Sequence, residues 1–206
     1  MRKIPKHIEN PFDNIVIDIC EDVAPYFKLL DFTPNMITFL SFLFGIKAIK
    51  DFRDNNYLQS GIIYMISYIF DCLDGHYARK YNMVTKFGDY FDHIKDCTIG
   101  IPITLLLINK LSQSKDFTSI ILLFTLFLSM FMFPIHLGCQ ELYYDKINPN
   151  NDSDTLGILK KYCPSTIQNI NKITIENSMI YTKYFGCGTF VIIFLLSSFY
   201  LSCIKE

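Results

Sequence analysis

Two long, almost uncharged runs constrain this chain more than any other feature. Residues 120–137 and 189–204 contain no Asp, Glu, Lys or Arg, and each approaches the length of about 20 residues that a helix needs to cross a bilayer. Other apolar stretches are shorter or interrupted, yet they are too numerous for a soluble protein in which half of 206 residues are hydrophobic. The sequence therefore predicts an all-α integral membrane protein.

Proline, glycine and polar clusters place the predicted helices. Gly186 and Gly188 favour a break in the last apolar region, which would then hold two short helices or one long bent helix. If the last apolar region holds two helices, the chain forms a bundle of six transmembrane helices within a domain at 33–206. The predicted spans are 34–49, 57–78, 88–108, 118–137 and two within 173–204.

The segment 1–32 is predicted to precede that domain. Apolar residues recur at helical spacing across 11–30, which predicts an amphipathic helix. Such a helix is suited to the membrane interface, although the pattern fits an ordinary packed helix equally well.

The charge and the cysteine spacing argue against nucleic-acid binding, a zinc site and a disulfide framework. The net charge is −1 and the basic residues are scattered, so nothing suggests a nucleic-acid partner. The seven cysteines are far apart and form no Cys-x-x-Cys pair, so we expect buried, unpaired thiols rather than a zinc site or disulfides. With six spans and both termini in the cytosol, twelve Lys and Arg residues face the cytosol and six face the other side.

A pattern of polar residues surrounds the turn between the second and third predicted spans, which this topology places in the cytosol. Asp71, Asp74 and Ala78 fall on one helix face, and Gly88, Asp92 and Asp96 fall on one face of the next. A turn at about 81–86 makes the two helices antiparallel, so four carboxylates are expected to converge. The residues of the pattern are Asp71, Asp74, Gly75, Ala78, Arg79, Gly88, Asp92 and Asp96.

Four carboxylates inside a membrane require compensating charge. Hard oxygen ligands suit Mg²⁺ or Mn²⁺, and an open site of this kind binds a diphosphate. The small residues Gly75, Ala78 and Gly88 let a ligand approach the backbone. Arg79 is suited to pairing with a phosphate, or alternatively to anchoring the helix end at the membrane surface.

This arrangement, D-x2-D-G-x2-A-R-x8-G-x3-D-x3-D, resembles the signature of the CDP-alcohol phosphotransferase (CDP-alcohol phosphatidyltransferase) family. The start of the first span, Thr33-Pro34-Asn35-x-x-Thr38, is also similar. The direct resemblance covers roughly 33–96, and the remainder matches in hydropathy only.

The resemblance implies a dimeric six-helix bundle with a cytosol-facing site, a CDP-activated lipid donor and a small alcohol acceptor. By similarity, Asp71, Asp74 and Asp92 bind metal, and Asp96 binds metal or acts as the general base. Similarity also implies a CDP site at Gly75, Ala78, Arg79 and Gly88, with release of CMP.

Three further polar residues flank the pattern. Asp89 shares a face with Asp92 and Asp96 and is interpreted as solvated. His93 is interpreted as structural, with contact to substrate as the alternative. Lys95 either counters the acidic cluster or reaches toward the membrane surface, and the second interpretation is favoured.

Residues around the last Asp bear on which alcohol is the acceptor. Family members that use glycerol phosphate commonly carry Lys directly after the last Asp, where this chain has Cys97. Lys86, Lys95 or Lys160 could substitute for that Lys. The stretch from Asp74 to Gly88 resembles phosphatidylinositol synthases, although the Arg typical of those enzymes is missing. We therefore expect CDP-diacylglycerol and an unphosphorylated alcohol, inositol first.

Phe91-Asp92-His93 instead resembles the choline and ethanolamine phosphotransferases, which use a CDP-alcohol and diacylglycerol. Two more remote alternatives are a membrane prenyltransferase, whose acidic motifs lie farther apart, and a non-enzymatic cation transporter, which needs no Gly75, Ala78 and Arg79.

Overall fold

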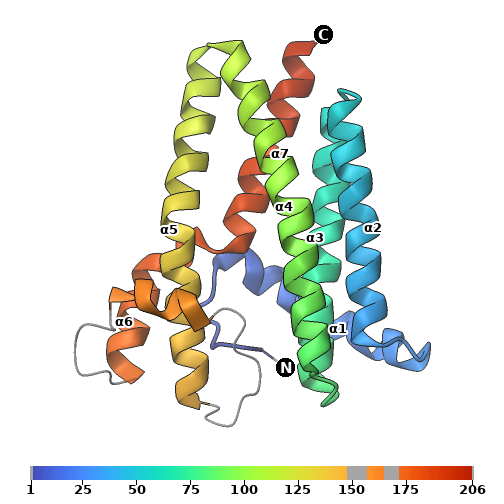
Figure 1. Ribbon diagram of the computed structural model, residues 1–206, viewed down its shortest axis with the longest axis vertical. Helices are drawn as coiled ribbons and strands as arrows, with labels where there is room; N and C mark the ends of the chain where they lie inside the picture. Colours follow the sequence, from blue (N-terminus) through green and yellow to red (C-terminus); the bar gives the residue numbers. More distant parts are fainter. Residues whose placement is uncertain (1, 148–156, 165–171, 206) are drawn as a thin grey trace.

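The computed structural model describes residues 2–147, 157–164 and 172–205, and all regular structure in these ranges is helical. The helices α2 to α5 and α7 run roughly along the long axis, while α1 and α6 lie toward the end that holds the N-terminus (Figure 1). The last described residue of α7 lies at the opposite end. The elements are α1 (Pro11–Leu29), α2 (Pro34–Arg53), α3 (Tyr57–Lys80), α4 (Lys86–Ser114), α5 (Phe117–Ile147), η1 (Gly157–Tyr162), α6 (Lys172–Thr182), η3 (Lys183–Phe185) and α7 (Cys187–Lys205).

Capping residues explain where several helices begin. Thr33 accepts a hydrogen bond from the Met36 amide at the start of α2, and Pro34 occupies the first turn, where a missing N–H costs nothing. At the start of α4, the Thr85 hydroxyl accepts from the Gly88 amide at 3.0 Å. The α3–α4 turn therefore falls where the sequence predicted it.

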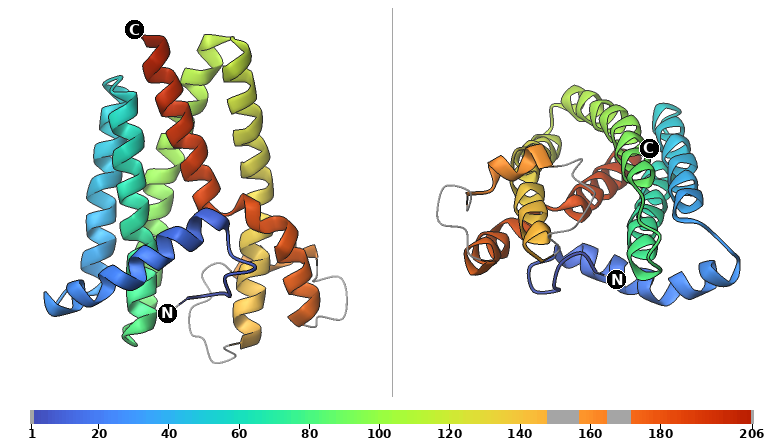
Figure 2. Two further views of the ribbon diagram at one scale, coloured as in Figure 1. Left: turned by 180° about the vertical axis from the view of Figure 1, so that it is seen from behind. Right: turned by 60° about the horizontal axis from the view of Figure 1, so that its bottom comes forward.

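The predicted helix at 11–30 is present as α1, which meets α2 at an angle of 116°. Figure 2 shows it lying across the ends of the long helices. Asn10 caps α1 and also donates to the Lys183 carbonyl, which ties the start of α1 to the α6–α7 junction. The interfacial position of α1 and the domain boundary after residue 32 remain predictions.

The count of six spans is not confirmed. By length and hydropathy, Phe117–Ile147 and Thr174–Ile204 qualify as spans, and a third qualifies if α1 and α2 are counted as one bent span. The predicted break in the last apolar region is present, since η3 and an extended Gly186 separate α6 from α7. However, α6 has 11 residues, which rise only about 17 Å against a hydrocarbon core of about 30 Å.

Small residues bring α2, α3 and α4 close together. Ser41 and Ser67 each donate a hydroxyl hydrogen bond to the other's carbonyl, at 2.9 and 2.7 Å. A Cβ on Gly45 would lie 2.8 Å from Ile99 of α4. The close packing fixes α3 and α4 relative to one another, and these two helices carry the acidic residues.

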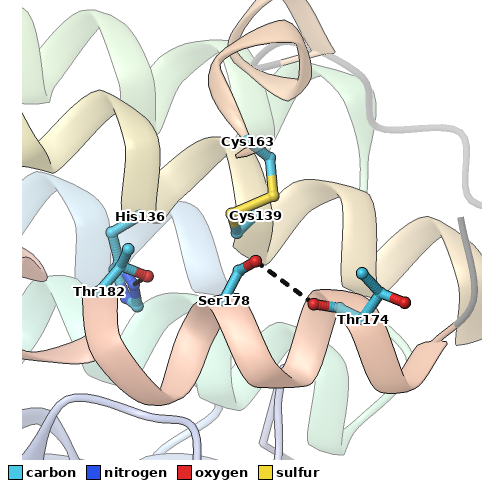
Figure 3. The surroundings of a disulfide bond; sticks show 6 residues. All are labelled: His136, Cys139, Cys163, Thr174, Ser178 and Thr182. Carbon is cyan, nitrogen blue, oxygen red and sulfur yellow. Dashed lines mark hydrogen bonds between the residues drawn. A yellow bond between two sulfur atoms is a disulfide. The ribbon is translucent and has the colours of Figure 1, made fainter. Parts of the chain in front are cut away.

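The expectation of seven unpaired, buried cysteines is wrong. Cys139 of α5 and Cys163 form a disulfide, although 24 residues separate them. The chain after α5 folds back so closely that a Cβ on Gly138 would lie 2.1 Å from the Leu159 carbonyl oxygen. Figure 3 shows the disulfide beside α6, where Thr182 lies 3.2 Å from Nδ1 of His136.

The other five cysteines are free. Cys20 is buried and Cys72 and Cys187 are half-buried, as small apolar residues would be, whereas Cys97 and Cys203 are exposed.

Candidate active site

The four aspartates of the sequence pattern come together where α3 and α4 face each other. Asp71, Asp74 and Asp92 each offer an oxygen, and these three oxygens lie within 4.8 Å of one another. Asp96 lies one turn beyond Asp92 and lines the same cavity, which has a volume of about 780 Å³. Helical spacing on α3 and α4, which both pack against α2, brings these side chains together.

Lys95 lies within this acidic group. Its Nζ is 3.0 Å from Asp92 and 2.8 Å from Asp96, and it also contacts Asp71. The Lys95 side chain is only 4% exposed, so the interpretation that it reaches toward the membrane surface is wrong. A buried charge needs partners of opposite charge. The three carboxylates stabilise the Lys95 ammonium, so the side chain turns toward them and not toward the membrane surface.

Asp74 differs from the other three aspartates. Its residue is 4% exposed, and its Oδ2 has no hydrogen-bond partner among the described residues. Asp96, in contrast, has a side chain that is 52% exposed. A buried carboxylate oxygen without a partner is costly, and a hard divalent cation shared with Asp71 and Asp92 would satisfy it. The residues present therefore fit Mg²⁺ or Mn²⁺.

The small residues and the arginine of the pattern line the same cavity. Gly75, Ala78, Arg79 and Gly88 all belong to its wall. A Cβ on Gly75 would lie 3.1 Å from the Arg79 guanidinium, so glycine leaves room for that side chain beside the aspartates. A Cβ on Gly88 would be similarly close to Asn35 of α2, at 3.1 Å. Arg79 thus lies in the cavity wall beside the aspartates.

His93 and Asp89 also line the cavity. Nδ1 of His93 lies 2.6 Å from the Asp89 carbonyl oxygen. Because a carbonyl only accepts, Nδ1 of His93 donates this hydrogen bond.

The rest of the cavity wall was not predicted from the sequence. Asn35 and Thr38 come from α2, and Lys3, Gln140 and Tyr144 come from the N-terminal segment and α5. Only Thr38 and Asn35 belong to a recognisable motif. The wall also includes apolar side chains of α4, α5 and α7, among them Ile101, Leu105, Ile108, Met130, Phe133 and Phe190.

Residues 31–146, more than half of the chain, match the sequence profile of the CDP-alcohol phosphatidyltransferase family. The chain belongs to this family. The match includes every residue of the acidic pattern and its neighbours on α2, α3, α4 and α5.

Curated relatives of this family align with the chain over a limited part. The chain is 34% identical over 85 residues to CDP-diacylglycerol–inositol 3-phosphatidyltransferase of Drosophila melanogaster, covering 40% of this chain and 38% of that protein. It is 37% identical over 76 residues to archaetidylinositol phosphate synthase of Pyrococcus horikoshii, covering 37% and 40%. It is 35% identical over 80 residues to CDP-diacylglycerol–glycerol-3-phosphate 3-phosphatidyltransferase of Rickettsia typhi, covering 37% and 45%.

The aligned part thus spans less than half the length of these relatives. No solved structure matches the chain significantly.

Proposed function

We propose that the protein is a metal-dependent enzyme of phospholipid biosynthesis. It transfers a substituted phosphate from a CDP-linked lipid donor to the hydroxyl of a small alcohol, and CMP leaves. The observation that carries this proposal is the group of Asp71, Asp74 and Asp92 oxygens within 4.8 Å of one another on one cavity. Its unsatisfied Asp74 oxygen calls for a cation, and Arg79 in the same wall suits a phosphate.

Each residue of the pattern has a proposed role. Asp71, Asp74 and Asp92 hold Mg²⁺ or Mn²⁺, which when bound offsets negative charge on the diphosphate and on departing CMP. Arg79 pairs with a phosphate beside Gly75, and the small residues Gly75, Ala78 and Gly88 let the nucleotide approach the helices.

We propose Asp96 as the general base. Its exposed carboxylate on the cavity wall accepts the proton of the alcohol as the new oxygen–phosphorus bond forms and the bond to CMP breaks. If so, Asp96→Asn lowers turnover and leaves binding of CDP-diacylglycerol and Mn²⁺ nearly intact. Calorimetric titration of both ligands into the variant measures this, and a loss of Mn²⁺ affinity parallel to the loss of turnover would identify Asp96 as a metal ligand instead.

The proposed donor is CDP-diacylglycerol and the first proposed acceptor is inositol. Cys97 in place of Lys after the last Asp argues against a phosphorylated acceptor, and the name of the Drosophila relative specifies inositol. The name of the Rickettsia relative specifies glycerol-3-phosphate instead, so the acceptor needs a direct test.

That test is release of CMP from CDP-diacylglycerol by the purified protein, with inositol, serine or glycerol phosphate and with Mg²⁺, Mn²⁺ or excess chelator. We expect turnover with inositol and metal only. Turnover that survives chelation would refute the metal-dependent function, and a product from glycerol phosphate alone would correct the acceptor. A parallel reaction with CDP-choline and diacylglycerol tests the choline-type alternative, which His93 after Asp92 favours.

For the membrane arrangement we propose five crossings, by α2, α3, α4, α5 and α7, with α1 and α6 at the cytosolic interface. The short α6 is the reason for five rather than six. In this arrangement Lys183 lies on the cytosolic side and Lys205 on the opposite side, the reverse of their places in the six-span arrangement. The count of Lys and Arg residues therefore stays at twelve on the cytosolic side and six on the other. The active site then faces the cytosol.

Single cysteines at Lys80, Lys160, Lys115 and Lys205 test this arrangement in a background whose free cysteines are replaced by serine. The first two are expected to be labelled from the cytosol and the last two from the opposite side. Cytosolic labelling at Lys205 would restore six crossings, and labelling of Lys80 from the opposite side would reverse the orientation. A homodimer, proposed on the family resemblance, is checked by light scattering in detergent.

A further inference from the structure

Lys95 contacts the acidic site directly and has no role in the proposed reaction. It belongs to α4, directly before Asp96, and its ammonium contacts carboxylates from both helices: Asp71 of α3 and Asp92 and Asp96 of α4. The Lys95 side chain is 4% exposed, whereas the Asp96 side chain is 52% exposed, so the ammonium is buried while the carboxylates are partly open to solvent. An ammonium held by three carboxylates fills a position that suits a cation.

The four aspartates are not shared equally by this ammonium. The buried Oδ1 of Asp71, Oδ2 of Asp74 and Oδ1 of Asp92 have no hydrogen-bond partner among the described residues. Lys95 pairs with the Asp71 and Asp92 oxygens but not with Asp74. Oxygens of Asp71 and Asp92 remain within 4.8 Å of an Asp74 oxygen. The acidic group therefore has two sides: one next to Asp96, where Lys95 lies, and one next to Asp74, where a cation is still needed.

The charge balance leads to the same division. Four carboxylates carry four negative charges, which two divalent ions would neutralise in full. Arg79 and Asp89, which line the same cavity, carry opposite charges and cancel in this sum. With Lys95 in place, one divalent ion leaves a net charge of −1, whereas two would leave the group at +1. Metal ions of a two-metal site lie about 3.5–4 Å apart, so a second ion on the Asp96 side would be pressed against the ammonium and repelled by it.

We propose that Lys95 is a built-in cation that limits this site to a single divalent ion, held by Asp71, Asp74 and Asp92. Lys95 is a positioning residue: it fixes the carboxylates of α3 and α4 relative to each other and decides how many metal ions they accept. This inference rests on the proposed function insofar as it takes metal binding at the aspartates as given.

The experiment counts Mn²⁺ ions bound to the purified full-length chain without nucleotide, by calorimetry and by the paramagnetic resonance signal of free Mn²⁺. We expect one ion per chain for the wild type and for Lys95→Arg, and two for Lys95→Met. Lys110→Met is the matched control, because it removes the same charge from the far end of α4, where Lys110 lies over the Tyr57 ring. It is expected to bind one ion.

Two ions bound to the wild type would overturn the inference without reference to any variant, and one ion bound to Lys95→Met would overturn it as well. Absence of Mn²⁺ binding in every protein would refute the metal site itself, and the proposed function with it, which distinguishes the two failures.

A second measurement applies because removal of Lys95 leaves four carboxylates uncompensated. Without metal, the melting temperature of Lys95→Met is expected to be lower than that of the wild type. Saturating Mn²⁺ is expected to increase the melting temperature of Lys95→Met by more than that of the wild type. Equal melting temperatures without metal would show that Lys95 does not compensate the aspartates, and would count against the proposal.

Discussion

The α3–α4 hairpin and the region from α5 to α7 are organised by different kinds of contact. In the hairpin, the turn between the helices is short, and residues at regular helical spacing on α3 and α4 meet around Lys95. From α5 onward, contacts join residues far apart in the chain, such as the Cys139–Cys163 disulfide and the hydrogen bond from Tyr143 to Glu176 at 2.9 Å.

The hairpin therefore carries the acidic residues, and the region from α5 to α7 supports the cavity around them. The acidic site needs only two helices with correct spacing, whereas α5 and α7 add apolar walls to its cavity without contributing an aspartate. Changes in the hairpin should therefore affect turnover more than stability, and changes between α5 and α7 should do the reverse.

The largest effect is expected for Asp74→Asn. The amide removes the charge of the most buried aspartate and weakens the metal site, which costs several kcal/mol and hence more than about a hundredfold in turnover. Asp71→Asn is expected to act similarly. The measurement is CMP release at saturating Mg²⁺, together with Mn²⁺ affinity.

Asp54→Asn is the control, because Asp54 follows the C-terminal end of α2 and is exposed. Turnover by Asp74→Asn within tenfold of the wild type would break the assignment of the hairpin as the chemical part of the molecule.

The hairpin is also the part that could be predicted from the sequence. The spacing of Asp71, Asp74, Asp92 and Asp96 determined which side chains would meet, since two antiparallel helices leave few alternatives. Lys95 was misread because periodicity gives the face of a helix but not the direction of a long, flexible side chain. Its proximity to Asp92 at i+3 was a signal for an ion pair.

The region after α5 could not be predicted in the same way. Nothing in the spacing of Cys139 and Cys163 indicates that the chain folds back between them, because the close contact at Gly138 is formed with Leu159, more than 20 residues away. The apolar run at 173–204 was read correctly as broken, but hydropathy did not show that α6 would be too short to span.

A smaller effect, on stability, is expected for Gly138→Ala. The new Cβ would lie 2.1 Å from the Leu159 carbonyl oxygen, a backbone atom that cannot rotate away. Overpacking of this kind costs about 1–3 kcal/mol, or a fall in melting temperature of roughly 2–12 °C for a chain of this size. Mn²⁺ binding should remain that of the wild type.

Gly100→Ala is the matched control, because a Cβ at Gly100 of α4 meets nothing within 4 Å, and alanine is the better helix former. A melting temperature for Gly138→Ala equal to that of Gly100→Ala would show that η1 is not held closely against α5.

The smallest effect concerns Asp13, which joins the two regions. Its carboxylate accepts a hydrogen bond from the Tyr68 hydroxyl of α3 at 2.6 Å, and a Cβ on Gly188 of α7 would lie 2.0 Å from it. Burial raises the pKa of Asp13 from 3.8 to about 6, against the opposing hydrogen bond from Tyr68. Burial likewise raises the pKa of the neighbouring Glu9 to about 7, and the charge of Asp13 adds to that rise.

The sign of the pH effect follows from the raised pKa. Between about pH 4 and pH 6 the unfolded chain has lost the proton that folded Asp13 retains, so the contribution of Asp13 to the free energy of unfolding falls as pH rises. Asp13→Asn does not titrate, and its amide oxygen still accepts from Tyr68. Its melting temperature relative to the wild type should therefore rise across this window, because the wild type loses stability as buried Asp13 is forced to ionise and the variant does not. Asp18→Asn is the control: it removes an exposed carboxylate whose pKa is lowered by Lys6 and Arg2. Asp18 is therefore ionised in both the folded and the unfolded chain above about pH 4, and the difference between Asp18→Asn and the wild type should stay nearly flat across this window. A difference between Asp13→Asn and wild type that is flat from pH 4 to pH 7 would show that Asp13 is not a buried, titrating link between α3 and α7.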